Sequence, residues 1–475
     1  MTEYKKVNDN EFVIEKKGKM KVPVRIFASE KIMEKLKDDK SLQQGSNVAQ
    51  MPGIYKHALM MPDAHQGYGF SIGGVAAFDA KEGCITPGGI GFDINCGVKF
   101  LITNLTKEQV EPKIKELLEA IYARVKVGVG GESKIRLEDD ELDAVLKTGA
   151  KWTLEKGYAT KDDLEHCEEN GTMEQADPSK VSQKAKKRGR KQLGTLGAGN
   201  HFMEIQVVDE IFDEKIAKAF GIEKKGQIGV MIHCGSRGLG HQVCSDYIRR
   251  MEDEQPELMA SLPEKDLIYA KAGTKLANDY FGAMCSAANF AWANRQVIAF
   301  EVRNAFKEVF GDSELKHVYD VAHNIAKLEK HMIDGEEKEV YLHRKGATRA
   351  FPPGHPDVPE AYRAVGQPII LPGSMGTASY ILVGTQKAME ETFGSTAHGA
   401  GRVMSRHAAI NQFRGEDIKK QLEAKNITVK AGSWKGLSEE APQVYKKIED
   451  VIQVTVDAGL AGLVARVVPL GVIKG

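Results

Sequence analysis

The stretch Gln227-Ile-Gly-Val-Met-Ile-His-Cys-Gly-Ser236 indicates the kind of fold that this 475-residue chain adopts. Its apolar run predicts a buried β-strand, followed by the loop Gly235-Ser-Arg-Gly-Leu-Gly240 and a helix from about Gln242. His233 stands at the end of that strand, where an unpaired imidazole is costly to bury. Backbone N–H groups in a glycine loop before a helix favour a bound phosphate. The stretch therefore predicts a sheet whose strand ends carry ligands.

Four further segments place a potential metal ligand or nucleophile beside glycine or polar residues. They are Gly91-Phe-Asp-Ile-Asn-Cys-Gly97, Gly199-Asn-His-Phe-Met-Glu204, Tyr319-Asp-Val-Ala-His-Asn324 and Ala397-His-Gly-Ala-Gly-Arg402. A cysteine and several histidines mixed with a carboxylate suit a transition metal, and glycine lets the backbone approach an anion closely. Because the segments are far apart in the sequence, we expect one interleaved α+β domain over residues 1–475. Mixed sheets would surround a central metal and nucleotide cleft, with helical insertions.

Other stretches predict the remaining elements. A helix is expected from Thr106 to about Arg124, and residues 130–190 are polar and helix-leaning, so we expect a helical surface insertion or lid over 106–190. Further expected elements are a strand at 21–27, a helix near 29–38, one or two helices over 265–310, strands at 316–327, 338–343, 368–385 and 461–475, and helices at 402–413 and 416–424.

The composition excludes several classes of protein. The chain is 42% hydrophobic with a formal net charge of zero, so any nucleic-acid contact must rest on a local patch. Six cysteines without a C-x-x-C pair predict neither a disulfide framework nor a zinc ribbon. No apolar run approaches the roughly 18–20 residues of a membrane span, and the N-terminus lacks an apolar signal core. We expect a cytoplasmic protein with no membrane contact.

The candidate metal ligands are Asp93, Cys96, His201, His233 and His323. Three-residue spacing in a loop lets the carboxylate of Asp93 and the thiolate of Cys96 face one metal pair, and a thiolate can bridge two cations. A turn aspartate with a buried cysteine, and satisfied core histidines, are the structural alternatives. If residues 200–207 form a strand, Asn200, Phe202 and Glu204 share one face and His201 takes the other.

Two glycine-rich segments suggest a nucleotide. Glycines at 399 and 401 leave His398 open to an approaching phosphorus atom, as a histidine nucleophile needs; a plain turn histidine is the alternative. The turn at 372–379 is able to wrap a nucleotide, although a hairpin turn would look the same. The chain has no G-x-x-x-x-G-K-[ST] loop, no strand-bounded G-x-G-x-x-G and no Lys-x-Asp-Gly element. Covalent activation through lysine is therefore not expected.

Seven motifs together closely resemble the RtcB family, the GTP-dependent tRNA-splicing RNA ligases. They are Met61-Pro-Asp-Ala-His-Gln-Gly-Tyr-Gly69, Pro87-Gly-Gly-Ile-Gly-Phe-Asp-Ile-Asn-Cys-Gly97, Leu193-Gly-Thr-Leu-Gly-Ala-Gly-Asn-His-Phe202, His233-Cys-Gly-Ser-Arg-Gly238, His343-Arg-Lys-Gly-Ala-Thr-Arg349, Leu371-Pro-Gly-Ser-Met-Gly376 and His398-Gly-Ala-Gly-Arg402. With the terminal Lys474-Gly475, the resemblance covers nearly the whole chain.

The resemblance implies a ligase that uses GTP and two Mn²⁺ to join RNA 3′-phosphate or 2′,3′-cyclic phosphate ends to 5′-hydroxyl ends. Asp93, Cys96 and His201 would hold one metal, and Cys96, His233 and His323 the other. His398 would become guanylylated, giving an RNA-3′-pp-5′-G intermediate. The implied nucleotide-binding residues are Asn200, His201, Phe202, Met203, Glu204, His323, Asn324, Pro372, Gly373, Ser374, Met375, Ser379, His398, Gly399, Ala400, Gly401 and Lys474.

Charge and position suggest five residues for RNA phosphates, with a solvated surface as the alternative: Arg188, Arg190, Arg237, Lys345 and Arg349. The resemblance implies tRNA half-molecules as substrates and the activator archease as a partner of some members; a monomer is expected. Two other functions stay open from the residues. A dinuclear metallophosphatase would use the same ligands without a covalent nucleotide, and a non-catalytic RNA-binding module would not need metal.

Overall fold

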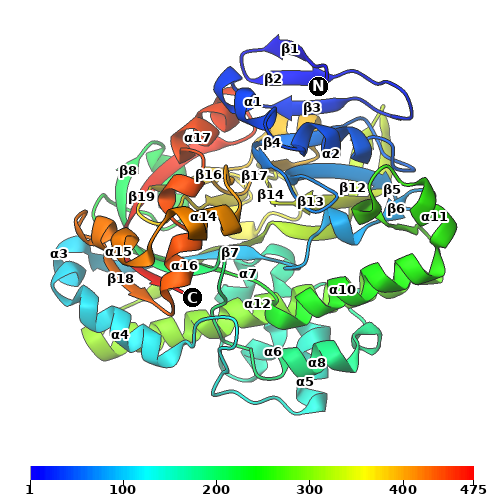
Figure 1. The fold of residues 1–475 in the computed structure, drawn as a ribbon. Helices are drawn as coiled ribbons and strands as arrows, with labels where there is room; N and C mark the ends of the chain where they lie inside the picture. The colour runs from blue at the N-terminus through cyan, green and yellow to red at the C-terminus, as the bar shows by residue number, and fades with distance from the viewer. Residues whose placement is uncertain (1) are drawn as a thin grey trace.

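The computed structural model describes residues 2–475, and two large sheets dominate it (Figure 1). The strand order of the first sheet is β1 (Lys5–Asn8), β2 (Glu11–Ile14), β3 (Val24–Phe27), β4 (Ala58–His65), β5 (Ile72–Asp79), β13 (Glu336–Lys345) and β12 (Asn324–Ile333). Strands β3 and β4 pair in parallel, whereas the neighbouring pairs are antiparallel. The C-terminal half of the chain thus completes a sheet that the N-terminal residues begin.

The second sheet brings most of the ligand-bearing segments together. Its order is β11 (Leu315–Ala322), β7 (Gly97–Thr106), β9 (Gln227–Cys234), β8 (Phe202–Ile211), β19 (Gly462–Lys474), β16 (Ser379–Val383) and β15 (Pro368–Leu371), with β18 (Thr428–Ala431) parallel to β19. Some neighbouring strands in this sheet, such as β8 and β19, therefore come from distant parts of the chain. The mixed sheets and many helices confirm the predicted α+β class.

Strand β9 is buried along its whole length, as its apolar run predicts. Ile228, Val230 and Ile232 pack against the long helix α12 (Lys275–Phe310). Because side chains alternate along a strand, Met231 and His233 point to the opposite face. Met231 packs there in a separate cluster with Phe100. The sequence of β9 therefore directs His233 away from the helical layer.

Helices cover one side of the second sheet. In Figure 1, α12 and α10 (Arg237–Glu254) lie side by side below the sheets, with α5 (Asp139–Thr148), α6 (Ala150–Glu155) and α8 (Gln183–Gly189) beneath them. Apolar side chains of α5 and α6 are buried in the same cluster as those of α12. The insertion expected over 106–190 thus shares a core with α12.

Shorter elements complete the chain. The remaining helices are α1 (Glu30–Leu36), α2 (Ser41–Val48), α7 (Lys161–Glu165), α9 (Glu214–Ala219), α11 (Pro256–Ser261), α13 (Gln386–Thr392), α14 (Arg406–Gln412), α15 (Gly415–Glu423), α16 (Trp434–Glu439) and α17 (Ile448–Asp457), and the short strands are β6 (Cys84–Ile85), β10 (Ala270–Lys271), β14 (Ala347–Arg349) and β17 (Ser395–Ala397). Within residues 2–475, no helix has the length and hydropathy needed to cross a membrane.

The structure divides one predicted helix and moves the start of another. The helix predicted from Thr106 to Arg124 is divided into α3 (Lys107–Val110), a 3₁₀ turn (Glu111–Lys113) and α4 (Ile114–Arg124). Pro112 lies in the turn, where its missing N–H and its ring disfavour a continuous helix.

The helix after β9 begins at Arg237 instead of about Gln242, so Gly238 and Gly240 belong to its first turn and not to an open loop. A Cβ at Gly240 would lie 1.9 Å from Ser236 Oγ. These glycines therefore allow close packing of the helix start.

Candidate metal and nucleotide site

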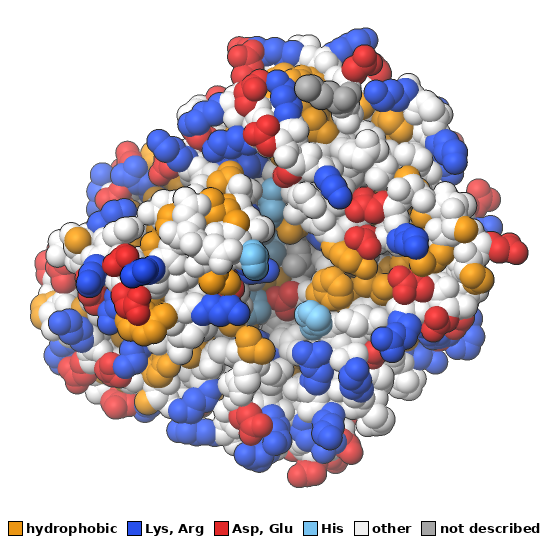
Figure 2. All heavy atoms as spheres, viewed as in Figure 1, with side chains coloured by type: hydrophobic (Ala, Val, Ile, Leu, Met, Phe, Trp, Pro, Cys, Tyr) orange, Lys and Arg blue, Asp and Glu red, His pale blue; other side chains and the backbone are white. Residues whose placement is uncertain are grey.

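A cleft of about 710 Å³ lies beside the ends of β7, β8 and β9. Figure 2 shows it as a hollow near the centre of the face, with histidine side chains inside. Most of the candidate residues line it: Asp93, Arg188, Asn200, His201, Phe202, His233, Arg237, His323, Asn324, Lys345, Pro372, Gly373, Ser374, Met375, His398, Gly399, Ala400, Gly401 and Lys474. The folded chain thus gathers residues from distant segments around one cavity.

Asp93, Cys96 and His201 form the first group of potential metal ligands. His201 Nε2 lies 2.6 Å from Asp93 Oδ2 and 3.5 Å from Cys96 Sγ. Asp93 and Cys96 come from the loop before β7, and His201 immediately precedes β8. One carboxylate oxygen, one sulfur and one imidazole nitrogen thus converge, a donor set that suits a transition metal.

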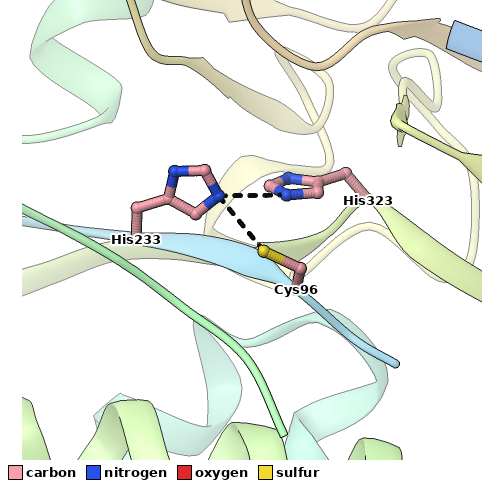
Figure 3. A group of neighbouring side chains, drawn as sticks. All are labelled: Cys96, His233 and His323. Carbon is pink, nitrogen blue, oxygen red and sulfur yellow. Dashed lines mark hydrogen bonds between the residues drawn. The ribbon is translucent and has the colours of Figure 1, made fainter. Parts of the chain in front are cut away.

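Cys96, His233 and His323 form the second group, and Figure 3 shows the three side chains converging. His233 Nε2 lies 3.3 Å from Cys96 Sγ and 3.2 Å from His323 Nε2. The ligand atoms within each group lie within 4.8 Å of one another. Because Cys96 belongs to both groups, its sulfur is placed to bridge two cations.

The protonation of His233 and His323 also fits cation binding. Burial lowers the pKa of His233 and His323 well below the ordinary histidine value, so both imidazoles are neutral, the form that binds metal. Burial would also lower the pKa of His201, but the neighbouring cysteines and Asp93 raise that pKa above the ordinary value, so this ring has to lose a proton when metal binds. Burial, and then the Asp93 carboxylate, raises the pKa of Cys96 to about 12. A thiol needs a cation beside it to ionise there, and metal binding would release its proton.

Arg295 of α12 fixes the segments that carry these ligands. Its guanidinium is fully buried and donates to the backbone oxygens of Asn95 and Cys234, each at 2.8 Å. It also donates to Asp320 Oδ1 at 2.8 Å. Asn95 and Cys234 are the chain neighbours of Cys96 and His233, and Asp320 lies in β11, just before His323. One side chain therefore holds three ligand-bearing segments in register.

Replacing Arg295 with methionine is expected to weaken metal binding by about 10- to 100-fold, the usual effect of losing a group that orients metal ligands. Lys99→Met is the matched control. The buried Lys99 ammonium lies 3.4 Å from the same Asp320 but bonds to neither backbone oxygen. Each variant breaks a buried ion pair and is expected to lose roughly 3–5 kcal/mol of unfolding free energy. Calorimetric titration with Mn²⁺ and thermal melting of the metal-free protein separate the two effects. Equal metal affinity in the two variants would contradict the assignment.

His398 lies beside the second ligand group and is oriented by a residue that sequence reasoning missed. Its Nδ1 lies 2.5 Å from Asp63 Oδ2, and the same oxygen accepts the backbone N–H of His398 at 3.0 Å and of Gly399 at 3.2 Å. Burial would raise the pKa of Asp63, but the His398 imidazole and its hydrogen bonds hold that pKa below the ordinary value. In a neutral imidazole with this orientation, the proton lies on Nδ1, where it is donated to Asp63, and the lone pair lies on Nε2.

Asp63 belongs to the quoted motif Met61–Gly69, but no local pattern pairs it with His398, because 335 positions separate them. The close approach of the two segments requires a residue without a side chain at position 401. Gly401 has a φ of +73°, and a Cβ there would lie 2.1 Å from the backbone oxygen of Asp63. Glycine at 401 therefore allows the histidine loop to rest on the aspartate.

Some of the remaining nucleotide candidates line the cleft, and others lie behind the lining and support it. The hairpin loop between β15 and β16 lines the cleft, and Ser379 Oγ accepts the Gly373 N–H at 3.0 Å behind it. Gln206 donates to both Ser379 Oγ and Glu204. Cys96, Met203, Glu204 and Ser379 are not part of the lining. Met203 is part of a hydrophobic cluster, so its side chain faces away from the cleft.

Asn324 and Lys474 mainly make hydrogen bonds to the backbone of neighbouring segments. Asn324 Nδ2 donates to the backbone oxygen of Asp93 at 3.2 Å, and Asn324 Oδ1 accepts the Gly346 N–H. Lys474 Nζ donates to the backbone oxygens of Gly199 and His201, and burial lowers the pKa of Lys474 to about 8. Both residues shape the wall of the cleft.

The expected alternation of Asn200 and His201 is wrong. Asn200 Nδ2 lies 3.6 Å from Cys96 Sγ, and His201 Nε2 lies 3.5 Å from the same atom. The strand begins only at Phe202, so the alternation of a strand does not apply to the two residues before it. Both side chains therefore approach the sulfur of Cys96.

The five basic candidates differ in accessibility. Arg188 is exposed at the cleft, and Arg190 pairs with Asp139 outside the lining. Arg237 is buried and donates to Thr195 Oγ1 and the Gly128 oxygen. Lys345 donates to the backbone oxygens of Tyr68 and Phe70, and burial lowers the pKa of Lys345 to about 7.

The structure does not bring Arg349 to the cleft. The residue is 1% exposed and bonds to Gln367 and Glu169. Its position at the end of a polar motif predicted a phosphate contact, but the carboxylate of Glu169, which is distant in the sequence, accepts a hydrogen bond from its guanidinium instead. The guanidinium is therefore engaged within the protein and not available to RNA.

Comparison with known proteins agrees with the geometry. A family model described as "tRNA-splicing ligase RtcB" matches residues 44–475. Proteins named tRNA-splicing ligase RtcB are similar over nearly the full length. The one from Thermococcus kodakarensis is 56% identical, over 96% of this chain and 95% of its own. Those from Pyrobaculum aerophilum (55%, covering 96% and 95%) and Archaeoglobus fulgidus (54%, covering 99% and 98%) are nearly as similar.

Proposed function

Because this chain belongs to the RtcB family, we propose that it is an RNA ligase of tRNA splicing and RNA repair. It would join RNA 3′-phosphate or 2′,3′-cyclic phosphate ends to 5′-hydroxyl ends, with GTP as the activating nucleotide. The observation that carries this proposal is His398, whose Nδ1 is held by Asp63 while its ring lies 4.8 Å from that of His323 between ring centroids. A nucleophile and a metal-ligand set therefore share one cleft.

The donor set suits transition metals, and we propose that it holds two Mn²⁺ ions, one at Asp93, Cys96 and His201 and the other at Cys96, His233 and His323. Bound there, the cations would neutralise phosphate charge and orient the leaving group. The rings of His233 and His323 are neutral, and the ligand atoms of both groups converge before any ion binds. The chain therefore supplies a largely preorganised site.

In the first step, the Nε2 lone pair of His398 attacks the α-phosphorus of GTP. A P–N bond forms and the bond to pyrophosphate breaks, so pyrophosphate leaves with the bonding electrons. The positive charge that develops on the imidazole is stabilised by Asp63, which keeps the Nδ1 proton in place. The result is His398 carrying GMP.

In the second step, an oxygen of the RNA 3′-phosphate attacks the same phosphorus and the P–N bond breaks, giving RNA-3′-pp-5′-G. The 5′-hydroxyl oxygen then attacks the RNA phosphorus and forms the new phosphodiester. The P–O bond to the guanylyl phosphate breaks, GMP leaves with the bonding electrons, and the hydroxyl proton passes to solvent. A cyclic end would first be opened by water. Arg188, exposed at the cleft, is our candidate for an RNA phosphate contact.

The nucleotide would lie between the hairpin loop at 372–375 and the glycines at 399–401, where backbone N–H groups favour phosphate. Asn200, Phe202, Asn324 and Lys474 line the same space. We propose that Glu204 reads the guanine from directly behind Phe202 and Asn200 of the lining, where Gln206 donates to its carboxylate and to Ser379. Burial raises the pKa of Glu204 to about 8.

The test is intact-mass measurement and peptide mapping after incubation with GTP and Mn²⁺. A GMP adduct on the peptide that contains His398 supports the ligase. Phosphatase activity with bound metal and no adduct would favour the dinuclear hydrolase instead. Archease dependence, a monomeric state and a cytoplasmic location remain predictions, testable by activity with and without archease, by light scattering and by fractionation.

A further inference from the structure

Three aromatic side chains form a cluster on the rim of the cleft, which the proposed reaction leaves without a role. Tyr68, Phe92 and His241 all line the cavity. The Phe92 and His241 rings stack, with centroids 4.8 Å apart and planes 27° apart, and Tyr68 meets Phe92 edge-on at 5.4 Å. Tyr68 is 37% exposed and His241 is also exposed. The cluster therefore offers free ring surface to a ligand entering the cleft.

The segments that carry the three rings are fixed by hydrogen bonds and by the start of α10. Lys345 Nζ donates to the backbone oxygens of Tyr68 and Phe70 at 2.7 and 2.9 Å. His241 lies in the second turn of α10, which begins directly after β9. Phe92 precedes the metal ligand Asp93, and adjacent Cα atoms are about 3.8 Å apart. A group stacked on these rings would thus stand beside the proposed metal and nucleotide site.

A cation accompanies the rings. Arg188 is exposed, lines the same cavity, and donates from Nη1 to Gln242 at 3.1 Å, so it lies next to His241 in space. Aromatic faces combined with arginine are the usual means of holding unpaired nucleotides, because rings stack on bases and guanidinium groups bind phosphates. With zero net charge overall, the chain depends on such local contacts to hold RNA.

We propose that Tyr68, Phe92 and His241 form a stacking platform for the base of the terminal nucleotide of an RNA substrate strand. This proposal deepens the proposed function and rests on it, because it names how an RNA end is held next to the reacting groups. Stacking accepts any base, so the platform would fix the position of the end without requiring a particular sequence.

The test uses the full-length protein with Mn²⁺ and no GTP. Short single-stranded RNAs carry 2-aminopurine at a 5′-hydroxyl end, at a 3′-phosphate end or internally, since stacking quenches its fluorescence. Quenching of an end label, but not of the internal one, is expected and shows which end is held. Tyr68→Ala and His241→Ala are each expected to raise the Kd for RNA about tenfold, whereas Tyr68→Phe and His241→Phe, which keep a ring, stay close to the unmodified protein.

An RNA whose terminal nucleotide lacks a base provides the second arm. It is expected to bind the unmodified protein about tenfold more weakly, and the alanine variants should weaken it little further. Equal binding of the abasic and intact RNAs, or no quenching at either end, would overturn the proposal. So would variants that lose GTP affinity while binding RNA normally, because the rings would then serve the guanine. End quenching without any GMP adduct on His398 would leave the platform standing and remove the proposed ligase mechanism.

Discussion

Cys96→Ala is expected to abolish binding of both metal ions and to end RNA ligation while the protein still folds. The Cys96 sulfur belongs to both ligand groups, so its removal leaves each group with two donors. The loss of affinity should far exceed the roughly 10- to 100-fold effect of losing a group outside the ligand set. Metal content after dialysis and calorimetric titration with Mn²⁺ measure it.

Cys285→Ala is the matched control, because this cysteine is equally buried but lies in the helical core on α12. Removing the same atoms there should leave metal binding intact. Thermal melting of the metal-free proteins should give similar values for both variants. Full ligation by Cys96→Ala, or its failure to fold when Cys285→Ala folds, would show that Cys96 is not a functional ligand.

His398→Ala is expected to bind GTP and metal but form no GMP adduct and join no RNA that ends in a 3′-phosphate. The side chain supplies the attacking Nε2, and the remaining donors of the cleft are unaffected. Intact-mass measurement with GTP and Mn²⁺ checks the adduct. RNA that already carries the 3′-guanylyl group bypasses the missing step, so its ligation by this variant is the expected rescue.

Two further variants sharpen this result. Asp63→Asn removes the charge that stabilises the imidazole and is expected to slow adduct formation roughly 10- to 100-fold, since a hydrogen bond to a charged group is worth about 1.5–3 kcal/mol. His407→Ala removes an exposed histidine of α14 and should leave the adduct unchanged. Normal ligation of 3′-phosphate ends by His398→Ala would show that another residue is the nucleophile.

Several features were predictable because they depend on local patterns. The apolar run of β9, the turn between β15 and β16 and the final strand β19 were predicted close to their observed positions. The convergence of the candidate metal ligands was also predictable, because soft and borderline donors stood in unusual places: a cysteine in a glycine-bounded loop and histidines at strand ends. The seven family motifs, which follow one another in a specific order along the chain, predicted the family.

Other features depend on contacts between distant segments, which no local pattern shows. Asp63 holds His398, and Arg295 holds Asn95 and Cys234, only because the two sheets and α12 come together. Arg349 looked like a phosphate ligand until the fold supplied its buried partners.

The sequence by itself therefore determined the α+β class, the strongly apolar strands such as β9 and the kinds of donor that the chain can offer. The tertiary structure decided which donors share a cavity, which nitrogen of His398 is free, and which charges are neutralised inside the protein. The physical reason is that apolar patterns act along short stretches of backbone. Hydrogen bonds and ion pairs instead depend on distances that packing alone sets.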